Sequence, residues 1–386
     1  DGRRIFDGIS SWWVVTHGHR NPRIIAAVKA QADVLDQVIF AGFTHAPAER
    51  LARMLLDRVN RPGANLGHVF FSDSGSTAVE VAIKMALGYW RNSGEPRSRI
   101  VALEHAYHGD TIGTMSAGAR GVFNAAYAPL LFDVERLPFP NAGEEQKTLE
   151  AFEAICRREP PAALMVEPLI LGAGGMLIYG PQVLTELKSI CNRFGVLFIA
   201  DEVMTGFGRT GTFLASDQAN IAPDIVCLAK GITGGSLPLA VTLATEAVYA
   251  AHYSTDRAKT FFHSSSYTAN PIACAAAVAN LEIWDEEPVL ERIADLCRLQ
   301  AERLAPFKND ARFSGVRQLG TITALDLAVR DGGYLAGIGP KLQALFLARG
   351  VLLRPLGNTI YVLPPYATTG ADLDLVYSAV RDAAGL

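Results

Sequence analysis

The 386-residue sequence has few charged residues and no long uninterrupted apolar run. Lysine, arginine, aspartate and glutamate together make up 19% of the chain, and the formal net charge is −4. A weakly acidic chain of this kind argues against nucleic acid or an anionic membrane as a partner. Even residues 162–179 are broken by Glu167-Pro168 and by a glycine run, so no segment is suited to span a membrane.

Cysteine is also scarce, with five residues dispersed through apolar segments: Cys156, Cys191, Cys227, Cys274 and Cys297. An odd, scattered set is typical of buried thiols in a reducing compartment, so we expect a cytoplasmic protein without a disulfide framework. The eight histidines lack acidic or cysteine partners at ligand spacing, and no metal site is expected. No signal peptide is recognised. Because the sequence begins at Asp1, within an apparent hairpin, we expect that residues preceding it are missing.

Two short apolar segments each end in one charged residue. Residues 196–200 are followed by Asp201 and residues 224–229 by Lys230, with glycine-rich turns after both. Bounded apolar runs of this length are typical of buried parallel strands, whose carboxyl ends lie at the ligand-binding edge of an open α/β sheet. A carboxylate and an amine at this edge suit a cofactor with a basic ring nitrogen and an aldehyde, such as pyridoxal phosphate. Lys230 would form the Schiff base, and Asp201 would keep the ring nitrogen protonated.

Each of these residues alone has a simpler interpretation. An aspartate at the end of a strand often caps a helix, and a lysine beside glycines is often a solvated loop residue. The pair, with the turn Gly-Phe-Gly-Arg-Thr-Gly at residues 206–211 between them, is more specific. This pattern resembles the class III aminotransferases, which are fold-type I pyridoxal-phosphate enzymes. The resemblance implies the roles given above to Asp201 and Lys230, both of which are expected to be catalytic.

A cofactor phosphate site is expected where residues 72–77 open a helix over residues 78–90. Small residues at a helix N-terminus leave N–H groups free to bind an anion, although the same residues equally predict ordinary capping. In the resembled family this position binds the cofactor phosphate, which implies that role for Gly75 and Ser76. The resemblance also places Tyr107, in the turn Tyr-His-Gly-Asp, over the cofactor ring as a catalytic and binding residue.

The loop before an alanine-rich helix over residues 272–284 contains Ser264, Ser265 and Ser266. Serine runs are usually flexible loops. Class III enzymes, however, place a hydroxyl from this loop on the phosphate of the neighbouring subunit's cofactor. Position favours Ser266, with Ser265 adjacent, and Ser264 would lie beside the substrate. The resemblance therefore implies a homodimer with shared active sites.

The substrate site is expected to involve the two ends of the sequence. Trp12 and Trp13 are either core residues or an aromatic wall for a substrate. Arg354 follows an expected strand and either grips a carboxylate or forms a surface salt bridge. With the Tyr-His-Gly-Asp turn and Tyr361, these residues resemble the class III enzymes of biotin synthesis, which aminate an aliphatic oxo-acid with S-adenosylmethionine as donor. The substrate contacts implied are Trp12, Trp13, Tyr107, Asp110, Lys230, Ser264, Arg354 and Tyr361.

We therefore expect an α/β protein with a mostly parallel seven-stranded sheet covered by helices. Residues 46–288 would form this large cofactor-binding domain, and residues 289–386 a smaller α+β domain. Residues 1–45 would contribute to the small domain and the active site. An ω-amino-acid:pyruvate aminotransferase is the alternative function, and a decarboxylase or aminomutase on the same scaffold is a third. A nucleotide-binding module is disfavoured because no phosphate loop with Lys-Ser/Thr is present.

Overall fold

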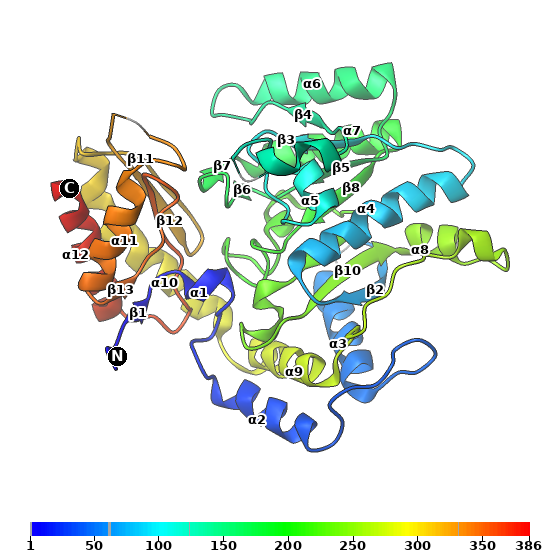
Figure 1. Ribbon diagram of the computed structural model, residues 1–386, viewed down its shortest axis with the longest axis horizontal. Helices are drawn as coiled ribbons and strands as arrows, with labels where there is room; N and C mark the ends of the chain where they lie inside the picture. Colours follow the sequence, from blue (N-terminus) through cyan, green and yellow to red (C-terminus); the bar gives the residue numbers. More distant parts are fainter. Residues whose placement is uncertain (1, 61–62, 123, 331) are drawn as a thin grey trace.

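The computed structural model describes residues 2–60, 63–122, 124–330 and 332–386. The chain forms a larger α/β part and a smaller part packed against its side (Figure 1). The larger part is built on a seven-stranded sheet. In spatial order its strands are β2 (Leu66–Ser72), β10 (Ala240–Thr245), β9 (Ile225–Leu228), β8 (Leu197–Asp201), β5 (Ala163–Val166), β3 (Ile100–Leu103) and β4 (Glu135–Leu137).

The sheet is mostly parallel, as the sequence predicted. β10 runs antiparallel to both of its neighbours, whereas β9, β8, β5, β3 and β4 pair in parallel. Successive residues alternate between the two faces: Leu164 and Phe198 join the main core, while Met165 and Ile199 pack in a second cluster with helix α4 (Gly75–Asn92). Because both faces are covered, the strands read as continuous apolar runs.

Helices cover both faces of the sheet (Figure 1). α4 and α8 (Glu246–His252) contact the β2, β10 side on one face. The other face is covered by α3, α6, α7 and α9, and α2 packs on α9. Their bounds are α2 (Pro22–Ala32), α3 (Ala46–Val59), α6 (Glu145–Arg158), α7 (Pro181–Phe194) and α9 (Pro271–Glu286), and the short α5 spans Ile112–Ala117. α7 shows why such helices form where they do, since it begins with Pro181 and ends at Gly195 with φ +62°.

The segment before α6 has the polar composition of a surface loop, but it is only partly one. Phe139 is buried, and α6 already begins at Glu145. The first turn of α6 is exposed and polar, because its buried side starts only at Thr148. A helix whose first turn faces water has the composition of a loop at that end.

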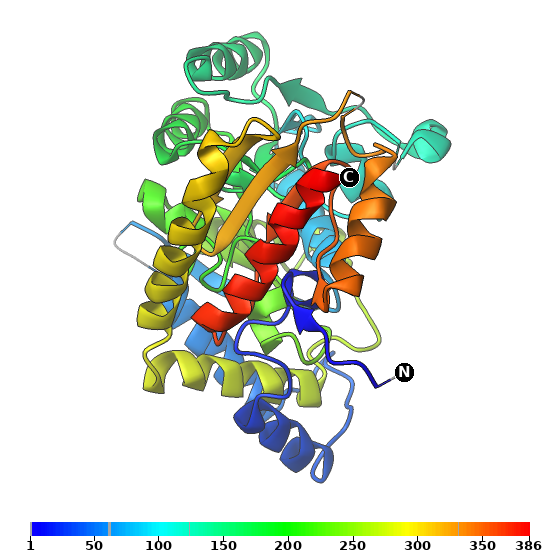
Figure 2. The same ribbon diagram turned by 90° about the vertical axis from the view of Figure 1, so that its left-hand side faces the viewer.

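The smaller part contains an antiparallel sheet of β11 (Phe313–Leu319), β12 (Ile322–Leu327) and β14 (Thr359–Val362). Helices α10 (Val289–Leu304), α11 (Ile338–Ala348) and α12 (Gly370–Asp382) lie on its outer face (Figure 2). β1 (Phe6–Asp7) pairs in parallel with β13 (Val351–Leu352), so the N-terminal segment joins this part. The domain boundaries given above stay predictions. Within the described residues, no helix combines the length and apolar character that crossing a membrane requires.

Candidate active site

A cavity of about 650 Å³ lies where the carboxyl edge of the central sheet meets the N-terminal segment and the turn that carries Arg354. Ten of the site residues expected from the sequence line this cavity. They are Trp12, Trp13, Gly75, Ser76, Tyr107, Asp110, Asp201, Lys230, Arg354 and Tyr361. The tertiary fold thus gathers into one space residues that span 350 positions of the sequence.

Lys230 and Asp201 reach the cavity from adjacent parallel strands. Asp201 is the last residue of β8, and Lys230 opens a short 3-10 turn after β9. The backbone of Lys230 has φ +45°, a strained conformation for a residue with a side chain. The pKa of Lys230 is lowered, chiefly because the cavity removes its ammonium group from water; the nearby Asp201 and Glu167 carboxylates oppose this effect. The site therefore destabilises the charged ammonium form of Lys230 relative to a lysine in water, which suits a nucleophilic amine.

The Asp201 carboxylate is held rigidly. One oxygen lies 2.7 Å from Nδ1 of His108, and the other accepts a hydrogen bond of 3.1 Å from the Val203 amide. Both Asp201 and His108 are buried. His108 was assigned no role from the sequence, although it stands inside the Tyr-His-Gly-Asp turn and could have been found there. A carboxyl group fixed in this way is placed to hold a protonated ring nitrogen.

The start of α4 lies at the cavity wall and leaves backbone N–H groups free there. Ser74 caps the helix by accepting from the Thr77 amide at 3.3 Å, and the Thr77 hydroxyl accepts from the Ser74 amide at 3.0 Å. The N–H groups of Gly75 and Ser76, in the first turn, have no acceptor within the helix. A Cβ on Gly75 would lie 2.6 Å from Cγ1 of Val203, so only glycine fits. Capping and anion binding, the two interpretations of this segment, are thus compatible.

The residues present therefore fit pyridoxal phosphate on structural grounds. An amine, a buried carboxylate and a helix N-terminus with free N–H groups all face the same cavity. Tyr107 adds an aromatic side chain, and its hydroxyl donates to Asp110 at 2.7 Å. Burial, followed by the Asp110 contact, raises the pKa of Tyr107, so the phenol stays protonated.

The two tryptophans lie in different surroundings. Trp13 is buried, and its Nε1 donates to the Tyr361 hydroxyl at 3.0 Å. The same ring lies 5.4 Å from Nζ of Lys230. Trp12 is 52% exposed, and the guanidinium of Arg354 stacks over its ring at 4.2 Å. Trp13 thus serves both the core and the cavity wall, whereas Trp12 and Arg354 form a cationic, aromatic site at the cavity.

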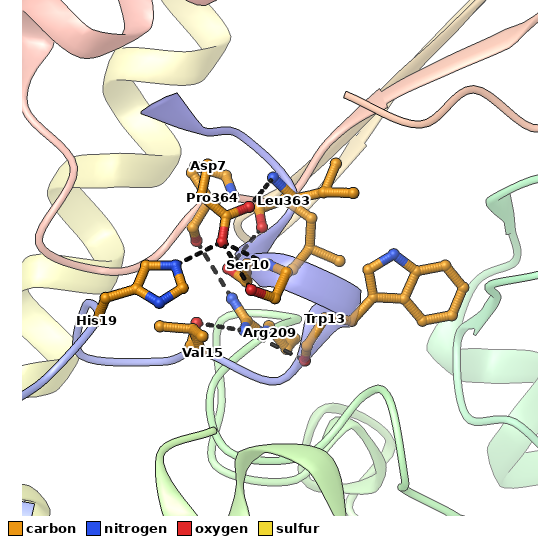
Figure 3. A network of polar contacts seen from close by, with 10 residues as sticks. Asp7, Ser10, Trp13, Val15, His19, Arg209, Leu363 and Pro364 are labelled. Carbon is orange, nitrogen blue, oxygen red and sulfur yellow. Dashed lines mark hydrogen bonds and ion pairs between the residues drawn. The ribbon is translucent and has the colours of Figure 1, made fainter. Parts of the chain in front are cut away.

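The N-terminal segment is shaped by a polar network (Figure 3). Asp7 accepts from the amides of Ile9 and Ser11 and contacts His19. Ser10 and Trp13 both have positive φ, and the hydroxyl of Ser10 donates to the Leu363 carbonyl. These contacts bend the segment sharply just before and within the tryptophan pair.

Arg209, from the Gly-Phe-Gly-Arg-Thr-Gly turn, anchors the same segment. Its guanidinium is fully buried and donates to the carbonyls of Trp13, Val15 and Pro364, as Figure 3 shows. This arginine was assigned no individual function from the sequence. It joins the large part, the N-terminal segment and the C-terminal part at the tryptophan wall.

The predicted phosphate-contacting serines lie outside the cavity that this chain forms. The hydroxyl of Ser265 donates to the Asp73 carboxylate, and the carbonyl of Ser266 accepts from Gln37 at 2.9 Å. The prediction assigned this loop, except for Ser264 beside the substrate, to the neighbouring subunit's site. Because the structure contains a single chain, the contact of this loop with a neighbouring subunit's cofactor stays a prediction.

Fold and site together define a pyridoxal-phosphate-dependent aminotransferase: the chain belongs to the class III aminotransferase family, whose pattern it matches over residues 1–384. It is 50% identical, over 99% of its length and 91% of the relative's, to the adenosylmethionine-8-amino-7-oxononanoate aminotransferase of Synechococcus elongatus. The crystal structure of the enzyme of that name from Methanocaldococcus jannaschii is similar, with a TM-score of 0.94 and 33% identity over all of this chain and 89% of that one. An amine transaminase from an uncultivated Pseudomonas species, solved with pyridoxal phosphate bound, has a TM-score of 0.93 and 35% identity over all of this chain and 91% of that one.

Proposed function

We propose that this enzyme transfers an amino group from S-adenosylmethionine to 8-amino-7-oxononanoate, giving 7,8-diaminononanoate for biotin synthesis. The observation that carries the proposal is the Arg354–Trp12 stack in the same cavity as Lys230. A long aliphatic acceptor needs apolar walls for its methylene groups and a cation for its distant carboxylate. The relative from Synechococcus elongatus, with half of its residues identical, carries the name of this reaction.

The cofactor would be held by groups from three elements. The N–H groups at the start of α4 would bind the phosphate of pyridoxal phosphate. Asp201, oriented by His108, would bind the ring nitrogen and keep it protonated. Tyr107 would form one wall beside the ring. When bound, this cofactor supplies a reactive carbonyl and a ring that withdraws electrons from the substrate carbon.

Lys230 is the proposed general base. Because burial lowers its pKa, the amine of Lys230 gives up its proton more readily than a lysine in water, which suits a base. It would take the proton from the donor carbon that bears the amino group. It would then deliver a proton to the cofactor carbon that receives the amino group. In the second half of the cycle Lys230 would carry out the same steps in reverse order on the acceptor. Donor and acceptor would thus use one site in turn, and ping-pong kinetics are expected.

We also propose a homodimer in which Ser266, with Ser265 adjacent, contacts the cofactor phosphate of the neighbouring subunit. Large apolar side chains are exposed on two segments that meet in space, Ile39 and Phe43 on one and Phe262 and Tyr267 on the other. Gln37 joins these segments by donating to the Ser266 carbonyl. An exposed apolar area of this kind is typical of an interface. Ser266→Ala should weaken cofactor retention, and light scattering should show a dimer; a fully active, cofactor-loaded monomer would contradict the proposal.

The proposed location is the cytoplasm. All five cysteines are free thiols and four of them are buried, which is typical of proteins that work under reducing conditions.

A screen of half-reactions tests the function. The purified holoenzyme is mixed with one amino donor at a time, and the loss of the absorbance of the bound cofactor is followed. The enzyme that has received the amino group is then mixed with one acceptor at a time. We expect S-adenosylmethionine to remove the absorbance of the bound cofactor and 8-amino-7-oxononanoate to restore this absorbance. The likeness to an amine transaminase supports a second candidate, an ω-amino-acid:pyruvate aminotransferase. Efficient restoration by pyruvate, with none by the oxo-acid, would establish that alternative.

A further inference from the structure

Besides Asp201, a second buried carboxylate lines the active-site cavity. Glu167 directly follows β5, and its side chain is buried. One carboxylate oxygen accepts from the Tyr107 amide at 2.9 Å, and the other accepts from the Gly172 amide at 3.0 Å. Within the described part of the chain, no lysine or arginine forms an ion pair with Glu167. Both oxygens are therefore used to bind the backbones of two separate loops.

Those two loops contribute to different parts of the cavity wall. Tyr107 lies on the first loop and lines the cavity directly. Gly172, on the second, packs so closely that a Cβ there would lie 2.4 Å from Sδ of Met204 and 3.2 Å from the ring of Trp13. Both Met204 and Trp13 also line the cavity. A single carboxylate thus connects the Tyr107 wall to the wall formed by Trp13 and Met204.

The surroundings of Glu167 make this connection sensitive to protonation. Burial raises its pKa to about 7, and the nearby Asp201 carboxylate adds to the effect, while His108 and the two amides oppose it. The ionised carboxylate can accept from both amides, whereas protonation makes one oxygen a donor and weakens the bridge. Lys230 also interacts electrostatically with Glu167, as do the titratable phenols of Tyr107 and Tyr179.

We propose that Glu167 is a positioning residue: its carboxylate joins the Tyr107 loop to the Gly172 loop and so fixes the distance between the aromatic walls of the active site. We call this pair of hydrogen bonds, from the Tyr107 and Gly172 amides to Glu167, the Glu167 clip. The kinetic consequence of this clip rests on the proposed transaminase function. The structural part does not, because the two hydrogen bonds exist in the chain by itself.

Hydrogen–deuterium exchange of the holoenzyme and of the cofactor-free chain tests the clip without any substrate. Glu167→Gln has one amide oxygen in place of two acceptors, so peptides containing Tyr107 and Gly172 should exchange about 10- to 100-fold faster. Glu167→Asp, whose side chain is shorter, should change the same peptides even if the glutamine variant fails to fold. In the wild type, protection of these amides should fall as the pH drops through about 7, and in Glu167→Gln it should not.

Glu202→Gln is the matched control. Glu202 is also buried and also accepts from two backbone amides, those of Ala215 and Ser216, but it does not line the cavity. Its substitution should leave exchange at Tyr107 and Gly172 unchanged. Unchanged exchange in Glu167→Gln, or an equal increase in the control, would overturn the proposal.

A kinetic double-mutant cycle tests whether Glu167 acts through Tyr107. Glu167→Gln should lower kcat/KM for the acceptor about 10-fold or more, and this loss should shrink severalfold when Tyr107 is already alanine. If the loss of kcat/KM in the double variant equals the product of the losses in the two single variants, Glu167 does not work by positioning Tyr107. If the proposed substrates prove wrong, the cycle is run with the donor and acceptor found in the half-reaction screen, and the exchange result still decides the clip.

Discussion

The sharpest prediction concerns Arg354, which we propose binds the acceptor carboxylate. In Arg354→Ala the guanidinium above the Trp12 ring is removed, while the turn that carries it is kept in place by Pro355 and Gly357. A Cβ added to Gly357 would lie 1.8 Å from the carbonyl oxygen of Gly333, so the backbone of this turn packs closely without help from the arginine side chain. The substitution should therefore change binding and not folding.

The size of the effect follows from the exposure of Arg354. A fully buried ion pair that loses one partner costs about 2–5 kcal/mol. Arg354 is exposed and its neighbour Trp12 is 52% exposed, so water screens the contact and the lower part of this range applies. A charged hydrogen bond contributes about 1.5–3 kcal/mol. The kcat/KM for 8-amino-7-oxononanoate should accordingly fall about 10- to 150-fold.

The assay measures the two half-reactions separately in the variant. The acceptor reaction should lose most of its efficiency through a higher KM, while the donor reaction with S-adenosylmethionine should suffer less. Arg354→Lys is the matched control, because it keeps the charge but loses the planar fork, and it should lie between wild type and alanine. Equal losses in both half-reactions would refute the reasoning, since Arg354 would then serve the cofactor or the fold. An unchanged acceptor reaction would place the carboxylate site elsewhere.

Four further predictions follow from the same geometry. Borohydride reduction of the holoenzyme, followed by peptide mapping, should attach the cofactor to Lys230; label on another lysine would exclude it as the cofactor-binding residue. Asp201→Asn should lower turnover on the order of 10²-fold or more, because the charge facing the ring nitrogen is lost; near-normal turnover would mean that another group holds that nitrogen. Gly75→Ala should weaken cofactor affinity about 10-fold in a spectral titration, because the new Cβ meets a valine at 2.6 Å, whereas Gly121→Ala, in open space, should not; equal affinities in the two variants would contradict this explanation. Burial lowers the pKa of His17 from 6.5 to about 4, so the unfolded chain binds a proton that the folded chain does not, and the free energy of unfolding should decrease as pH falls from 6.5 to 4; denaturant titrations in which His17→Asn shows the same decrease would disprove this.

The sequence by itself determined the sheet and the positions of its charged residues. Short apolar runs ending in Asp201 and Lys230 are typical of buried parallel strands, and such strands bring their carboxyl ends to one edge. Residues 72–77 likewise predicted a helix start with free N–H groups. These are local patterns, a few residues long, and each carries its own physical reason.

The tertiary structure alone decided which distant residues meet. The pairing of β1 with β13 brings Trp12 to Arg354, and nothing in either segment specifies the other. The imidazole of His108 reaches Asp201 across 93 positions. Glu167 uses both oxygens on backbone amides, which have no side chain and therefore leave no trace in a sequence pattern. Contacts of this kind depend on how whole elements pack, and that is why local patterns could not reveal them.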